Sequence, residues 1–271
     1  MSKAPFHLTG GCLKPLVHLN RSLRHIAGIL VCAVAIPASI FSAQPAAPSK
    51  AALAAGMPYL RALADAGVAY AQRDFSKALD KLDIADQIQP NVPDTWNMRG
   101  AIYAEQHAYE KAGDAFEKAG KLNPGDFWPR YNLAQLLLMQ KKYGDAVEAF
   151  QKLEVYNGHA ELVQFKIVFA SLLAKKPDMA KPVLDAMKFP ADTPAYYFAH
   201  ASWGFAHKDE KEGNYWTDSA LKVFGPAQCI SFYDSLAALG WLPMRNADGS
   251  IPERVDLAKI PAASPQPIGT P

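Results

Sequence analysis

Cysteine is scarce in this chain, and acidic side chains are missing from its first fifty residues. The 271 residues contain three cysteines, of which Cys12 and Cys32 lie near the N-terminus and Cys229 stands alone in the remainder. A single thiol cannot form an internal disulfide, so the body of the protein must be held together by packing. Half of the residues are apolar, which is enough to build a sizeable core in a chain of this length.

Strong charge of either sign is lacking as well. Residues 1–50 hold five basic side chains, and the remaining residues hold 23 basic and 26 acidic ones, which leaves them with a net charge of about −3. Nucleic-acid binding depends on Lys and Arg side chains that neutralise phosphates. We therefore expect no nucleic-acid partner.

An uncharged run extends from Ile26 to Ala43 and follows a basic N-terminal stretch. A positive flank, an apolar run and small residues near its end are typical of an export signal. We predict that residues 1–43 are a signal peptide or an uncleaved signal anchor, followed by a linker over 44–57. The remainder is then expected in the periplasm or anchored in the membrane and facing the periplasm. Membrane contact is expected only through an uncleaved N-terminal segment.

Proline is absent from four long stretches, which are 59–89, 94–123, 130–176 and 195–225. Because proline is disruptive inside helices and tolerated in their first turn, these stretches predict pairs of helices that join at the intervening prolines. Apolar residues within the stretches recur at helical spacing rather than in alternation. The sequence therefore predicts an all-α fold.

The helical stretches repeat with a fixed period of 34 residues. Residues that are 34 positions apart carry the same kind of side chain, and we call each such set a column. Some columns hold small residues, and another holds large apolar residues. A small residue lets the two helices of a hairpin approach closely, and a large one fills the space between that hairpin and the next. The columns are Ala78, Ala112, Ala146 and Ala180; Leu82, Phe116, Phe150 and Leu184; and Ala66, Gly100, Ala134 and Val168.

The unit at 93–126 carries the most complete motif. Its residues are Trp96, Gly100, Tyr103, Ala112, Phe116 and Pro124. With these residues and spacings the chain resembles the tetratricopeptide repeat family, with Arg99 at a position where the family has leucine.

The resemblance implies a right-handed α-solenoid of antiparallel helix pairs. We predict four repeats over 58–194, a degenerate fifth hairpin with a capping helix over 195–240, and a Pro-rich tail over 241–271. Both terminal segments are expected to be extended or disordered. The four predicted repeats are 59–92, 93–126, 127–160 and 161–194.

Motifs of catalysis and of metal or phosphate binding are absent from the sequence. It has no glycine-rich phosphate loop, no serine nucleophile elbow, no Cys-x-x-Cys and no His-Glu-x-x-His. We expect no enzyme activity, no cofactor and no bound metal. One alternative stays open, because His200 and His207 are seven residues apart and would share a helix face in a metal-binding or hydrolytic protein.

The family resemblance implies a concave groove, lined by the first helices of successive hairpins, that holds an extended peptide or a helix. Carried over unit by unit, the groove residues are Tyr70, Asn97, Glu105, Trp128, Tyr131, Gln135, Phe165 and Phe169. Four of them, Trp128, Tyr131, Phe165 and Phe169, would form an apolar binding stretch. The alternative is that these aromatic side chains pack against neighbouring helices or against the chain's own Pro-rich tail.

The predicted function is that of a non-catalytic scaffold or adaptor that engages another protein of the cell envelope. A self-assembling structural envelope protein, whose exposed end face stacks, is the remaining alternative. The fold implies a mode of contact and does not name the partner.

Overall fold

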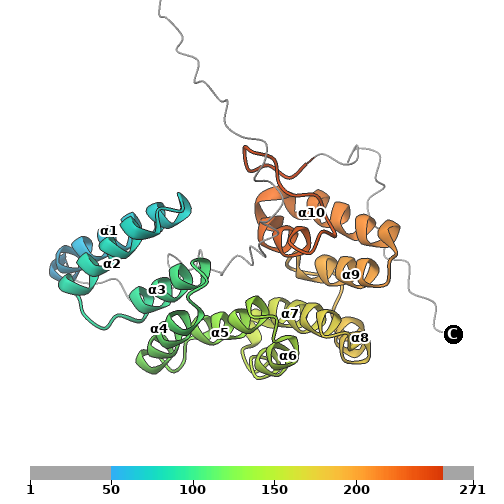
Figure 1. The fold of residues 1–271 in the computed structure, drawn as a ribbon, viewed down its shortest axis with the longest axis horizontal. Coiled ribbons are helices and arrows are strands. Elements are labelled where there is room, and N and C mark those ends of the chain that lie inside the picture. Colours follow the sequence, from blue (N-terminus) through green and yellow to red (C-terminus); the bar gives the residue numbers. More distant parts are fainter. Residues whose placement is uncertain (1–49, 253–271) are drawn as a thin grey trace, which may run out of the picture.

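The computed structural model describes residues 50–252, and within this range it places the side chains of 58–156 and 158–252. The predicted signal segment 1–43 and the tail residues 253–271 lie outside the described residues. Every regular element within the described range is helical (Figure 1). The elements are α1 (Lys50–Ala71), α2 (Phe75–Ile88), α3 (Pro93–Glu105), α4 (Tyr109–Leu122), α5 (Phe127–Met139), α6 (Tyr143–Gln151), a short 3-10 helix η2 (Asn157–His159), α7 (Ala160–Leu173), α8 (Pro177–Ala186), α9 (Ala195–Ala206) and α10 (Glu210–Ala237).

The helices of each pair are joined by the same tight turn. One residue of every turn has a positive φ between 57° and 63°, and the backbone N–H of the next residue donates to a carbonyl five residues earlier, at 2.9 Å. A left-handed conformation costs a non-glycine residue about 1 kcal/mol, which this helix-ending hydrogen bond offsets. The first four turn residues are 34 apart and the last follows after 33: Arg73, His107, Lys141, Lys175 and Lys208.

The columns of the sequence repeat form the packed interior of the solenoid. The members of the alanine column are fully buried, and the large side chains of the second column lie between one helix pair and the next with at most 3% exposure. Burying each large apolar side chain contributes about 1.5–3 kcal/mol. Gly100 shows how tight the fit is, since a Cβ atom added there would lie 2.5 Å from the Phe116 ring.

Arg99, which replaces the leucine of the family pattern, links α3 to α2. Its guanidinium forms ion pairs at 2.7 Å with Asp83 and with Asp86, both on α2. Hydrogen-bonded pairs of this kind offset the cost of burying the charge. The departure from the pattern therefore replaces an apolar contact between successive helices with a charged one.

Two boundaries differ from the sequence-based prediction. Helix α1 begins at Lys50, so that residues 50–57, which were predicted as linker, are helical. Helix α6 has 9 residues, whereas α2 and α4 each have 14, and the chain after Gln151 passes through turns before α7.

The fifth hairpin leaves the regular stacking. Helix α9 packs along α7 and only slightly touches α8, so α9 and α10 lie on the other side of α7 from α6 and α8 (Figure 1). Helix α10 bends at Gly225, which has a φ of 75°, and its second half brings Phe232 against α7 and α9. There Phe232 contacts Phe165 and Phe198, with ring centroids 5.1 and 5.5 Å apart.

The first part of the predicted tail is folded. Leu242 is buried, and the Tyr233 hydroxyl donates to the Pro243 carbonyl at 3.0 Å. Residues 241–252 therefore close the C-terminal end of the stack. Within residues 50–252 no helix combines the length and the apolar character needed to span a membrane.

The close approach at Gly100 can be tested with a matched pair of glycine substitutions. We expect Gly100→Ala to lower the free energy of unfolding by about 1–3 kcal/mol, because the new methyl group would overlap the Phe116 ring. Gly144→Ala in α6 adds the same methyl group where nothing lies within 4 Å, so it should be neutral or stabilising. Urea unfolding followed by circular dichroism measures both; equal stability of the two variants would contradict this packing.

Candidate protein-binding face

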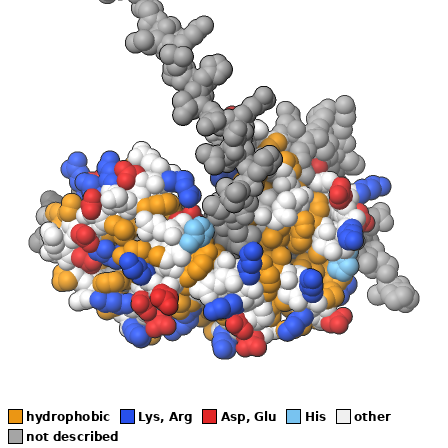
Figure 2. Space-filling view, in the orientation of Figure 1, with side chains coloured by type: hydrophobic (Ala, Val, Ile, Leu, Met, Phe, Trp, Pro, Cys, Tyr) orange, Lys and Arg blue, Asp and Glu red, His pale blue; other side chains and the backbone are white. Residues whose placement is uncertain are grey.

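The first helices of the pairs, α1, α3, α5 and α7, follow one another along one side of the solenoid (Figure 1). The predicted groove residues lie on these helices. Figure 2 shows that hydrophobic side chains reach the surface in short strips between charges of both signs. The visible face therefore carries no single-sign charge field.

A line of amide side chains connects α3 and α5. The Asn132 side-chain amide donates to the Asn97 side-chain oxygen at 3.0 Å, and both residues are buried. Gln135 lies one turn further along α5 and is buried as well. The side-chain oxygens of Asn132 and Gln135 have no hydrogen-bond partner. A buried unpaired oxygen costs about 1–3 kcal/mol, so each of these atoms gains from an N–H donor, which reaches it only where the packing around α5 opens.

Glu105 and Tyr70 form the N-terminal part of this face. The Glu105 carboxylate, with its side chain 8% exposed, pairs with the Arg73 guanidinium of the preceding unit at 3.1 Å. Burial raises the pKa of Tyr70, and the Glu105 charge adds to the shift. The Tyr70 phenol therefore stays protonated and can donate a hydrogen bond.

An aromatic cluster surrounds the start of α5. The His159 ring stacks on Phe127 with centroids 4.0 Å apart, and Trp128 meets His159 edge-on at 5.2 Å. Trp128 keeps part of its surface exposed, whereas Tyr131 is buried against Phe150 at 5.7 Å. Burial lowers the pKa of His159, and the Asp126 charge opposes that shift. Among these rings Trp128 and His159 keep part of their surface exposed, whereas Phe127 and Tyr131 are buried.

Phe165 and Phe169 must be corrected from binding residues to core residues. Their side chains are 0% and 1% exposed. Phe232 of α10 covers Phe165, and Trp241 lies 6.2 Å from Phe169. The aromatic stretch predicted for the C-terminal end of the groove is therefore filled by the chain itself, which agrees with the self-packing alternative.

The histidine hairpin does not form a ligand set. His200 is 7% exposed and lies between Tyr196 and Trp216, with ring centroids 4.5 and 4.6 Å away. His207 is exposed and stacks on Trp203 at 4.1 Å. Among the described residues, no group of three or more His, Cys, Asp or Glu side chains is placed to hold a metal ion. Nothing in this geometry favours the metal-binding alternative.

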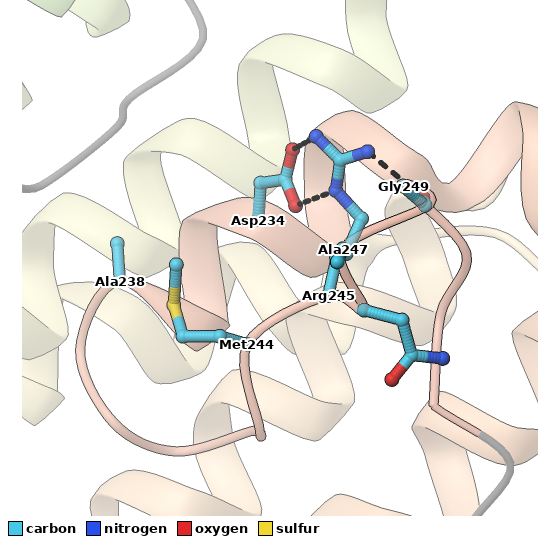
Figure 3. Close-up of a pocket in the computed structure, with 7 residues that line it drawn as sticks. Asp234, Ala238, Met244, Arg245, Ala247 and Gly249 are labelled. Atoms are coloured by element: carbon cyan, nitrogen blue, oxygen red, sulfur yellow. Dashed lines mark hydrogen bonds and ion pairs between the residues drawn. The ribbon is translucent and has the colours of Figure 1, made fainter. Parts of the chain in front are cut away.

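A cavity of about 220 Å³ lies beside the C-terminal loop and contains Arg245 (Figure 3). The guanidinium is already engaged, because it binds both Asp234 carboxylate oxygens at 2.8 and 3.0 Å and donates to the Gly249 carbonyl at 2.9 Å. Arg245 therefore fixes the loop against α10 and offers no free charge to a ligand.

Sequence reasoning missed Asn132, and it missed that the rings of Tyr156 and His159 contact Phe127 at the start of α5. Asn132 lies 35 residues after Asn97, one position out of the repeat, so the column comparison did not pair them. Tyr156 and His159 belong to the segment that follows the shortened α6. The 34-residue period predicts a helix of regular length at this point. The repeat alone therefore does not indicate the turns that follow Gln151.

Residues 103–175 match the sequence model of the tetratricopeptide repeat family. Peroxisomal targeting signal receptors are among the similar curated proteins. The receptor of Kluyveromyces lactis is 35% identical over 80 residues, which are 30% of this chain and 14% of the receptor. That of Saccharomyces cerevisiae is 37% identical over 65 residues, which are 24% of this chain and 11% of the receptor. The similarity thus spans less than one sixth of either receptor.

Two solved structures share the fold at 15% sequence identity. Pseudomonas aeruginosa PilF gives a TM-score of 0.50 over 69% of this chain and 90% of that chain. A tetratricopeptide repeat protein from Parabacteroides merdae gives a TM-score of 0.54 over 70% of this chain and 74% of that chain. At this identity the likeness concerns the fold alone, and it identifies the described helices as a tetratricopeptide-like stack.

The buried His200 predicts that the protein loses stability in mild acid. Burial lowers the pKa of His200 from 6.5 to about 4, with Asp185 opposing the shift and Lys181 adding to it. Between these two pH values the unfolded chain binds the proton and the folded chain does not, so stability falls as the pH is lowered through this window. The full effect is about 3 kcal/mol.

A pair of histidine variants isolates this contribution. We expect His200→Phe, which keeps an aromatic ring between Tyr196 and Trp216, to flatten the dependence of the unfolding free energy on pH between about 6.5 and 4. His207→Phe, at an exposed position, should leave the dependence as it is in the parent chain. Urea unfolding at a series of pH values measures it, and an unchanged slope in His200→Phe would disprove the assignment.

Proposed function

We propose that this protein is a non-catalytic scaffold of the cell envelope that holds a segment of another protein against the face formed by α1, α3 and α5. The tetratricopeptide-like stack supports a polypeptide as the ligand, because such solenoids present extended surfaces to their partners. The proposal restricts the groove to its N-terminal part, since the self-packing of Phe165 and Phe169 fills the C-terminal part.

The observation that carries the proposal is the pair of unpartnered amide oxygens on α5. Asn132 and Gln135 are neighbours on one face of the helix, and both side-chain oxygens lack a donor. An extended backbone or the first turn of a helix supplies free N–H groups in a row. A segment that displaces the side chains covering these oxygens would satisfy groups that the folded chain leaves unpaired.

Trp128 adds an anchor beside this polar line. Its ring is held edge-on by Phe127 and Tyr131 and remains partly exposed. Tryptophan side chains held rigidly in this way are frequent anchors in protein interfaces. The proposed ligand therefore places an apolar side chain against Trp128 and a backbone N–H near Gln135.

The names of the curated relatives agree with a polypeptide ligand. They are receptors for a targeting signal, although the similar region covers a small share of them. The envelope location rests on a different observation, the basic flank and apolar run that end at Ala43.

Selection of peptides from a random phage-displayed library on the full chain, followed by fluorescence titration, tests the binding face. We expect Trp128→Ala to weaken the selected peptides about tenfold or more. Gln135→Leu should weaken them about three- to tenfold while the protein stays equally stable or becomes more stable, because it removes a buried unpaired oxygen.

Tyr215→Ala on α10 is the control, since it removes an exposed aromatic ring from a distant hairpin. Circular dichroism verifies that each variant is folded. Selected peptides that bind all three variants equally well would contradict the proposed face. Light scattering over a concentration series separates it from the self-assembly alternative, in which the chain alone would grow in mass.

Export is tested by locating the mature N-terminus. We expect the full chain, expressed in a Gram-negative bacterium, to reach the periplasmic side, either cut after Ala43 or retained in the membrane at full length. Fractionation and intact-mass measurement distinguish these two results. Recovery of the full-length chain in the cytoplasm would disprove the export proposal.

A further inference from the structure

A second candidate surface results from the early end of α6. Because α6 stops at Gln151, five residues short of α2 and α4, about 7 Å of helix is missing from this position of the stack. A cavity of about 400 Å³ lies here, with Leu133 and Leu137 of α5 and Leu153 in its apolar lining. Val155 stands at its rim, 76% exposed. We call this cavity the α5/α6 furrow.

The α5/α6 furrow lies on the other face of α5 from the proposed peptide-binding face. At 100° per residue, the mean direction of Leu133 and Leu137 lies about 150° around α5 from that of Asn132 and Gln135. The furrow is independent of the proposed function, and a test of one does not depend on the other.

Two positive charges border the furrow. Arg130 donates to the backbone carbonyl of Asp126 at 3.0 Å, and the Lys152 side chain is exposed. Neither side chain forms an ion pair within the described residues, whereas Arg73, Arg99 and Arg245 all do. The furrow therefore combines an apolar floor with two cations that no carboxylate of the described chain neutralises.

We propose that the α5/α6 furrow binds an acidic amphipathic helix of a partner protein. Its apolar floor follows Leu133 and Leu137, and Arg130 lies on the same side of α5, so the lining extends over about 10 Å, or two turns of helix. A partner helix fits by packing its apolar residues between α5 and α6, as helices pack in a bundle. Its Asp or Glu side chains then meet Arg130 and Lys152.

The furrow is suited to a helix rather than to a small molecule. Small-ligand sites enclose most of the surface of their ligand. Here the rim residue Val155 projects into solvent, so the furrow stays open along one side. An open apolar strip with charged edges is the pattern that amphipathic helices recognise.

The test uses the full chain with labelled methyl groups and two matched synthetic helical peptides. One peptide carries Leu on one face and Glu beside it, and the other has Lys in place of every Glu. We expect the Glu peptide to shift the methyl resonances of Leu133, Leu137, Leu153 and Val155, and to bind about tenfold or more tightly than the Lys peptide.

Two variants locate the interaction. Lys152→Glu should weaken the Glu peptide about three- to tenfold, and Ala149→Phe should block it by filling the furrow. Lys142→Glu changes the same charge at the opposite, exposed end of α6 and should alter the affinity less than twofold. Circular dichroism and thermal unfolding verify that Ala149→Phe keeps the fold.

Four results would overturn the proposal. They are equal binding of the two peptides, methyl shifts confined to other parts of the chain, equal weakening by the two lysine variants, and no saturable binding of the Glu peptide up to about 1 mM. Laurate serves as a further probe. If laurate shifts the furrow methyl groups and the Glu peptide does not, the furrow takes a small amphiphile and the helix proposal is wrong.

Discussion

The close approach of two helices in each pair is the constraint on which the structure depends. At Gly100 there is no room for a methyl group beside Phe116, and the alanine column repeats the same restriction in every unit. Such contact is possible only if the turn between the helices is short and always of one shape. The recurring left-handed residue and the 2.9 Å hydrogen bond that ends each first helix provide that turn. Stacking of identical pairs then follows, because each pair alone leaves one apolar side uncovered.

The fifth hairpin shows what happens when this stacking stops. Helix α9 packs on α7, and the bend at Gly225 returns the second half of α10 over Phe165. The last apolar surface of the stack is thereby covered by the chain's own residues, and the side chains of Phe165 and Phe169 leave the surface. A solenoid needs such an end, since an uncovered final pair would expose a continuous apolar face to water. Because Phe165 and Phe169 of α7 are covered in this way, the proposed binding face is limited to α1, α3 and α5.

Helix α5 is the element on which both proposed surfaces meet. One of its faces carries the amide line of Asn132 and Gln135, and the other carries Leu133 and Leu137. The neighbouring units cover the flanks of α5, and both proposals place the partner at one of these two faces. The proposed scaffold role does not require a catalytic group. It requires a helix that its neighbours hold in place and that keeps part of its surface exposed. Helix α5 is held in place by its packing against α4 and α6.

The sequence by itself determined the repeat, the helical class and the buried columns, because a side chain that recurs every 34 residues needs the same contacts in each unit. It also placed Trp128 among four candidate groove aromatics, and the structure leaves Trp128 partly exposed. Tertiary structure alone decided that Phe165 and Phe169 are covered, because Phe232 and Trp241 reach them from positions more than 60 residues away. It also decided the place of the α5/α6 furrow, since α6 ends at Gln151 and Leu153 is buried beyond that end. The local sequence pattern determines which side chains are buried. The tertiary structure determines which distant residues pack against them.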